Sequence, residues 1–113
     1  MNKLFLQLLL FFSLNGLSQN ALNFDGVDDY VQTDYPGISG TASRTVEAWI
    51  RTTANANPSD GGVQQIITDW GTFVTAGRFT FNVLWSNAIR VELGGEGLSG
   101  TIAVNDGEWQ HVA

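Results

Sequence analysis

The chain has 113 residues, with 11 acidic residues against 5 basic ones, a formal net charge of −6 and no cysteine. This acidic balance argues against nucleic acid and anionic membrane surfaces as partners, because binding to both depends on Lys and Arg, and it permits neutral sugars, cations and basic proteins. Without cysteine there are no disulfides, so a secreted domain of this sequence depends on its core, a metal or a partner for stability.

Residues 1–18 have the pattern of a secretory signal peptide. Lys3 provides a positive start, residues 4–14 form an apolar run, and the small residues Gly16 and Ser18 stand at positions −3 and −1 of a cleavage site. The run is shorter than the roughly 20 apolar residues of a membrane span, so we predict no span in the mature chain. Cleavage after Ser18 leaves 4 basic residues against 11 acidic ones, a net charge of −7. We expect a secreted or cell-surface protein, with an uncleaved N-terminal anchor as the alternative.

The remainder of the chain has strand patterns and no helical periodicity. Apolar residues after residue 20 alternate with polar ones, and turn residues recur at short intervals, which is typical of an all-β sandwich or barrel. We predict strands at residues 21–24, 29–33, 45–52, 64–69, 78–84, 88–93, 101–104 and 108–113. The strands 78–84 and 88–93 are expected to form a hairpin, and the glycine-rich residues 94–100 a flexible linker.

The last strand follows an Asp-Gly turn. Its alternation places Trp109, His111 and Ala113 on one face, and the preceding strand 101–104 is its natural partner. Because Trp109 lies in this strand, and Trp49 lies in the strand 45–52, we expect both tryptophans in the core. We expect His111 to be a packed strand histidine, since one histidine alone makes no zinc site.

Three segments together suggest a family. Residues 106–113 read Asp-Gly-x-Trp-x-His-Val-Ala, residues 21–31 are a short strand, an Asp-Gly turn and Asp-Tyr-Val, and residues 45–51 read Thr-Val-Glu-Ala-Trp-Ile-Arg. In this order they resemble the laminin-G-like jelly rolls of the concanavalin-A-like lectin and glucanase superfamily. The resemblance implies an antiparallel β-sandwich. Because family members continue beyond the last motif, residues 19–113 are expected to be a truncated part of such a domain, with a small complete sandwich as the alternative.

Catalysis is not expected within this chain. Glucanases of the superfamily use carboxylates spaced Glu-x-Asp-x-x-Glu or Glu-x-Asp-x-Glu on one strand, which puts an acid and a nucleophile on the same face. The chain has neither spacing, and its one histidine supports no Ser/His/Asp arrangement.

A calcium site is a candidate at the first turn. Asp25, Asp28 and Asp29 cluster there, calcium prefers several carboxylate oxygens, and jelly rolls of the superfamily commonly hold this ion. The alternative is an Asx turn, in which Asp25 accepts a hydrogen bond from the amide of Val27 and no metal binds.

Sugar binding is the leading functional hypothesis. An indole face stacks on the apolar face of a pyranose while polar side chains hold its hydroxyls, and we assign this role to Trp70, Trp85 and Arg90. Ordinary edge aromatics are the alternative for the two tryptophans. The sequence thus predicts a secreted, non-catalytic carbohydrate-binding or adhesion module of a larger exported protein. The alternatives are a structural or protein-interaction module without a sugar site, and an accessory domain of an exported glycoside hydrolase.

Overall fold

The structure is a computed structural model that describes residues 21–113 except 39 and 41. The predicted signal peptide, residues 1–18, lies outside the described residues. The chain divides into two compact units, residues 1–33 and 34–113. Among the described residues, no helix is long and apolar enough to cross a membrane.

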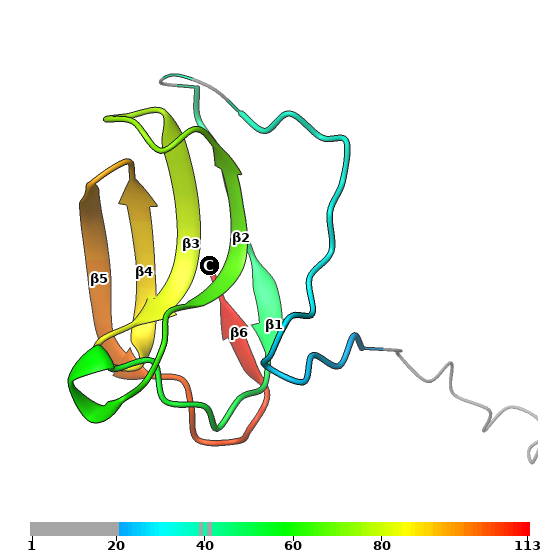
Figure 1. Cartoon of the computed structure of the whole chain (residues 1–113), viewed down its shortest axis with the longest axis vertical. Helices are drawn as coiled ribbons and strands as arrows, with labels where there is room; N and C mark the ends of the chain where they lie inside the picture. The colour runs from blue at the N-terminus through cyan, green and yellow to red at the C-terminus, as the bar shows by residue number, and fades with distance from the viewer. Residues whose placement is uncertain (1–20, 39, 41) are drawn as a thin grey trace, which may run out of the picture. The chain divides into compact units, whose positions relative to one another are not determined.

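The second unit is an antiparallel β-sandwich (Figure 1). Its elements are β1 (Ala48–Ile50), a short 3-10 helix (Pro58–Asp60), β2 (Gln65–Gly71), β3 (Arg78–Leu84), β4 (Ala88–Leu93), β5 (Glu96–Ala103) and β6 (Gln110–Val112). One sheet has the order β2-β3-β4-β5 and the other pairs β1 with β6. All these pairings are antiparallel, as the jelly-roll class requires, and the predicted all-β fold is confirmed.

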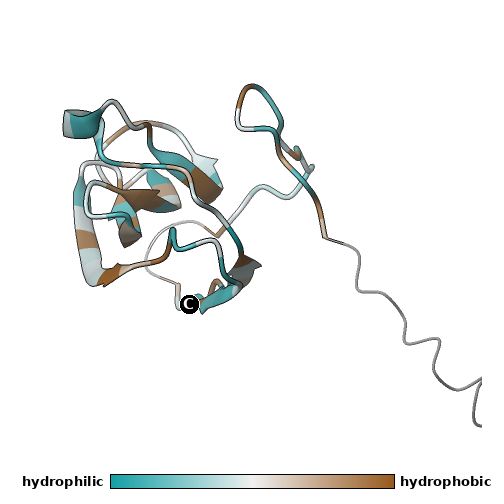
Figure 2. Cartoon of the chain, turned by 90° about the horizontal axis from the view of Figure 1, so that it is seen from below, coloured by the Kyte–Doolittle hydropathy of each residue, from teal (hydrophilic) through white to brown (hydrophobic). Residues whose placement is uncertain are grey.

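The core lies between the two sheets. Phe79, Phe81 and Val83 of β3 face it, and Figure 2 shows apolar and polar stretches following one another along the strands. The buried apolar residues that form this core cluster are Ala56, Phe79, Phe81, Val83, Val104 and Val112. From the second sheet Val46, Ala48 and Ile50 pack against this cluster, so the period of two fixes one apolar face on each sheet.

The predicted hairpin between β3 and β4 is confirmed. Leu84 pairs with Ala88, and a loop of residues 85–87 joins the strands. Both Trp85 and Asn87 have left-handed backbone conformations, with φ of 55° and 59°. Such a conformation is costly for a bulky residue such as tryptophan, so the surrounding contacts must hold it in place.

Two predictions for the C-terminal part are wrong. Residues 94–100 are not a flexible linker, because residues 96–103 form β5 and pair with β4. The strand before the last Asp-Gly turn therefore pairs with β4, and β6 pairs with β1, which lies far away in sequence. Glycine lowers strand propensity, but an available edge in the sheet overrides that local preference.

The first unit has no strand among its described residues, 21–33. The strands predicted at 21–24 and 29–33 are therefore not formed. The amides of Asp25 and Val27 donate instead to side-chain carboxylates of Asp29 and Asp25, at 2.9 and 2.8 Å. Local bonds of this kind compete with strand pairing.

Candidate functional site

Trp70 belongs to the packing of the sandwich and not to an open surface. Its ring stacks on Phe79 with centroids 4.2 Å apart and an interplanar angle of 15°, and its indole N–H donates to the carbonyl of Ile38 at 3.0 Å. Gly37 lies against the same ring, so closely that a Cβ at position 37 would overlap it. The flat side of the Trp70 ring and its indole N–H, the two groups that would bind a sugar, are therefore both occupied by contacts within the fold.

Trp85 and Arg90, the other two residues predicted to bind a ligand, do lie close together. Trp85 is 60% exposed, and the guanidinium carbon of Arg90 lies 5.7 Å from its ring centroid. Arg90 donates to a carboxylate oxygen of Glu92 at 2.5 Å, and both side chains are largely buried. This ion pair fixes the guanidinium group of Arg90. Arg90 therefore covers one face of the Trp85 indole ring, while the other face remains accessible. Trp70 pairs with Phe79, which lies six residues before Trp85 and about 20 Å from it at the usual rise per residue, so the three residues do not form one site.

The backbone around Trp85 is hydrogen-bonded to a neighbouring loop. The Trp85 N–H donates to the carbonyl of Ala56 at 3.3 Å, and the Oδ1 of Asn87 accepts from the Ala56 N–H at 2.6 Å. The carbonyl of Asn87 accepts from the N–H of Val104 at 2.9 Å. These bonds explain how Trp85 keeps its left-handed conformation, and they give the ring a rigid support.

Asn82 adds an unusual group beside this cation. It pairs with Arg90 across the β3–β4 ladder, so the two side chains share the outer face of the four-stranded sheet. Asn82 is 0% exposed, yet neither its amide nitrogen nor its amide oxygen has a hydrogen-bond partner in the protein. A buried polar group without a partner costs about 1–3 kcal/mol, so Asn82 is an unfavourable residue for stability at this position. We call Trp85, Asn82, Arg90 and Glu92 the Trp85 site.

A second surface lies on the outer face of the two-stranded sheet. Trp49 is 66% exposed and Trp109 is 48% exposed, which corrects the prediction that both are core residues. The His111 ring lies 5.2 Å from that of Trp49, and its Nε2 lies 3.3 Å from a carboxylate oxygen of Glu47. His111 is therefore an exposed and paired residue, not a packed one. The guanidinium carbon of Arg51 lies 5.5 Å from the ring centroid of Trp109. Glu47, Trp49, Arg51, Trp109 and His111 are called the aromatic face below.

Register explains why these tryptophans point outward. In β1 and the residues around it, Val46, Ala48 and Ile50 face the core, so Glu47, Trp49 and Arg51 must face away. In β6 it is Val112 that is buried, and Trp109 and His111 lie on the opposite face. The alternation in the sequence indicates which residues share a face, but it does not indicate which face is covered.

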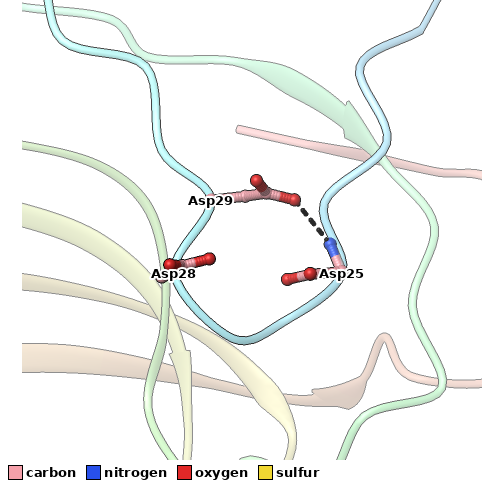
Figure 3. Close-up of side chains that lie close together, drawn as sticks. All are labelled: Asp25, Asp28 and Asp29. Atoms are coloured by element: carbon pink, nitrogen blue, oxygen red, sulfur yellow. Dashed lines mark hydrogen bonds between the residues drawn. The ribbon is translucent and has the colours of Figure 1, made fainter.

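The aspartate cluster lies within the first unit (Figure 3). Carboxylate oxygens of Asp25, Asp28 and Asp29 all lie within 4.8 Å of one another, and all three residues are exposed. One oxygen of Asp25 accepts from the amide of Val27 at 2.8 Å, which is the predicted Asx turn. One oxygen of Asp29 accepts from the amide of Asp25 at 2.9 Å. An all-oxygen set of this charge suits calcium, and the turn holds the set together.

Comparison with known proteins assigns the chain to a family. A laminin G family model, described as the concanavalin A-like lectin/glucanases superfamily, matches residues 25–113. The chain belongs to this superfamily. No curated protein and no solved structure matches the chain.

The superfamily match covers the aspartate cluster, the Trp85 site and the aromatic face. Its description joins lectins with glucanases, and members of one fold differ in what they bind. Within the superfamily, function therefore depends on the individual sites of a chain and not on the fold.

Proposed function

We propose that this superfamily member is a non-catalytic carbohydrate-binding module of an exported protein, and that it binds a neutral sugar at the Trp85 site. The observation that carries the proposal is the exposed Trp85 ring, which a rigid loop presents beside a cation fixed by an ion pair. A pyranose has an apolar C–H face and a rim of hydroxyls, so it suits an indole bordered by polar groups. Export follows from the pattern of residues 1–18, and N-terminal sequencing of the exported chain should find a start after Ser18.

Asn82 supports a ligand rich in hydroxyls. Its amide can donate through nitrogen and accept through oxygen, and a sugar hydroxyl can do the same. Asn82 is fully buried next to Arg90, so it would contact a sugar only through a bridging water or after a movement of that arginine. The acidic net charge also favours a neutral sugar over an anionic one.

Substitution of Trp85 tests the site. We expect Trp85→Ala to weaken binding to immobilised neutral polysaccharides by tenfold or more, because a central aromatic contributes about 2 kcal/mol. The melting temperature should change little, since the side chain is exposed. Trp85→Phe should retain part of the affinity through its remaining ring.

Phe73→Ala is the matched control, because Phe73 is another exposed aromatic outside the site. It should bind like the unmodified chain. Equal affinity of the Trp85→Ala chain on a panel of neutral glucans, mannans and galactans would refute the proposed site. A large fall in melting temperature would instead place Trp85 in the core.

Calcium binding at the aspartate cluster is a second proposal, favoured by the convergence of its carboxylate oxygens. Asp25, Asp28 and Asp29 would hold the ion, and water would supply its remaining oxygens. Calorimetric titration with calcium should show one binding event that Asp28→Asn weakens. Asp34→Asn, at an exposed carboxylate outside the cluster, should leave the titration unchanged. Absence of heat, or equal heat from both variants, would leave the Asx turn as the sole role of the cluster.

A further inference from the structure

The aromatic face has features that the Trp85 site does not explain. Two exposed tryptophans come from β1 and from the residue directly before β6, and neither takes part in the core cluster. Because Trp49 pairs with His111, Trp109 lies diagonally across the ladder from Trp49, at about 7–8 Å between backbone positions. The two indoles are therefore neighbours on one sheet face. Large exposed aromatic groups on one surface are a sign of a binding site.

Polar groups border both rings. His111 lies 3.3 Å from a carboxylate oxygen of Glu47 and contacts the ring of Trp49, and Arg51 lies over the ring of Trp109. The carboxylate and the guanidinium have opposite charges, so the face has no strong net charge to select an ion. Hydrogen-bond donors and acceptors thus surround two aromatic surfaces, an arrangement that matches the hydroxyl rim and apolar face of a sugar ring.

We propose that the aromatic face is a second carbohydrate-binding surface, which stacks two neighbouring rings of a neutral glycan on Trp49 and Trp109. A protein partner fits this surface less well, because the polar side chains of His111, Glu47 and Arg51 interrupt its apolar area. The proposal does not depend on the Trp85 site, since the two surfaces share no residue.

The two surfaces point away from each other. The inner faces of the two sheets pack together through Phe81, Val83 and Val112, so their outer faces lie on opposite sides of the sandwich. Arg90 and Asn82 lie on one outer face, and the aromatic face is the other. If both bind glycan, one chain joins two polysaccharide strands; this consequence rests on the proposed function of the Trp85 site. Linked sites of this kind raise the avidity for a dense polysaccharide.

The test uses the full chain and five variants on the same panel of immobilised neutral glucans, mannans and galactans. In a Trp85→Ala background, the residual binding should fall at least tenfold when Trp49→Ala and Trp109→Ala are added. Phe73→Ala in that background should change nothing. Trp49→Tyr and Trp109→Tyr together should retain most of the binding, because a tyrosine ring still stacks. Far-ultraviolet circular dichroism and melting temperature check that each variant is folded.

A second readout separates this proposal from that for the Trp85 site. The unmodified chain should precipitate or thicken a soluble polysaccharide of the bound type, and loss of either surface should abolish this effect while binding through the other remains. If the Trp49→Ala, Trp109→Ala chain binds every polysaccharide like the unmodified chain, the aromatic face is not a sugar site, whatever Trp85→Ala shows. A change in self-association alone, measured by sedimentation, would assign the face to protein contacts and also overturn the proposal.

Discussion

Asp106 shows how one side chain organises the turn before β6. Its Oδ1 accepts from the amide of Glu108 at 3.0 Å, and its Oδ2 accepts from the side-chain amide of Gln110 at 3.0 Å. The backbone bond from Glu108, followed by the bond from Gln110, lowers the pKa of Asp106 below its ordinary value of 3.8, because both bonds favour the charged carboxylate. These two bonds, which support the turn before Trp109 and His111, are strongest while the carboxylate is ionised.

The lowered pKa predicts a loosening of the turn in acid. The stabilisation is complete above the unfolded value of 3.8 and is lost as pH falls through the lower pKa of the folded state. The protection factor of the Glu108 amide, which corrects for the pH dependence of intrinsic exchange, should fall across that window, and the carboxyl carbon of Asp106 should titrate with it in NMR spectra. In Asp106→Ala the Glu108 amide should have a low protection factor at every pH. Titration of Asp106 at or above 3.8 in the folded chain would contradict the hydrogen bonds.

At the scale of the element, the segment before β1 is held by one arginine and one tryptophan. The guanidinium of Arg44 donates to the carbonyls of Ile38, Gly40 and Ala42, at 2.8, 2.6 and 3.1 Å. Trp70 of β2 donates to the same carbonyl of Ile38. This arrangement explains why Trp70, which the sequence places at a strand end, is a structural residue.

Gly37 is the position of this segment at which an added side chain would overlap the Trp70 ring. Its φ is +80°, and a Cβ there would overlap the Trp70 ring, so we expect Gly37→Ala to lower the free energy of unfolding by about 2–3 kcal/mol. Gly40→Ala is the matched control, because Gly40 also has a positive φ, of +64°, but an added Cβ would meet nothing within 4 Å. Chemical denaturation of both variants measures the difference. Equal losses would show that backbone strain alone is responsible and that the contact with Trp70 is unimportant.

At the scale of the whole molecule, the four-stranded sheet ends in an exposed edge. All residues of β5 are exposed, and the apolar side chains Leu98 and Ile102 are 80% and 79% exposed. Unpaired strand edges of this kind recruit other strands, and β5 has neither lysine nor proline to prevent it.

A charge on this edge should therefore reduce self-association. We expect Leu98→Lys to shift the sedimentation profile towards the monomer and to raise solubility, with little change in melting temperature. Val63→Lys, at an exposed apolar residue outside the strands, is the control and should have a smaller effect. Identical sedimentation of Leu98→Lys and the unmodified chain would show that the β5 edge is not a contact surface.

The sequence by itself determined the class of the fold and much of its local structure. Alternation predicted an all-β sandwich and the strands 78–84 and 88–93, and the turn at Asp25 offered an Asx turn as the alternative to a calcium site; all of these depend on residues close together in the chain. It also brought Trp85 and Arg90 to one place, since a hairpin loop lies next to its own strands.

Only the tertiary structure decided which face of each strand is covered and which strands pair. Trp49 and Trp109 alternate with the residues of their strands that face the core, and because Val112 and Ala48 pack into the core cluster, the tryptophans lie outside. The pairing of β6 with β1, and the strand at residues 96–103, depend on contacts between distant segments. The local sequence pattern specifies which residues of a strand share a face. Which face is buried and which strands pair depend on the whole sandwich, and these two properties place the aromatic face on its surface.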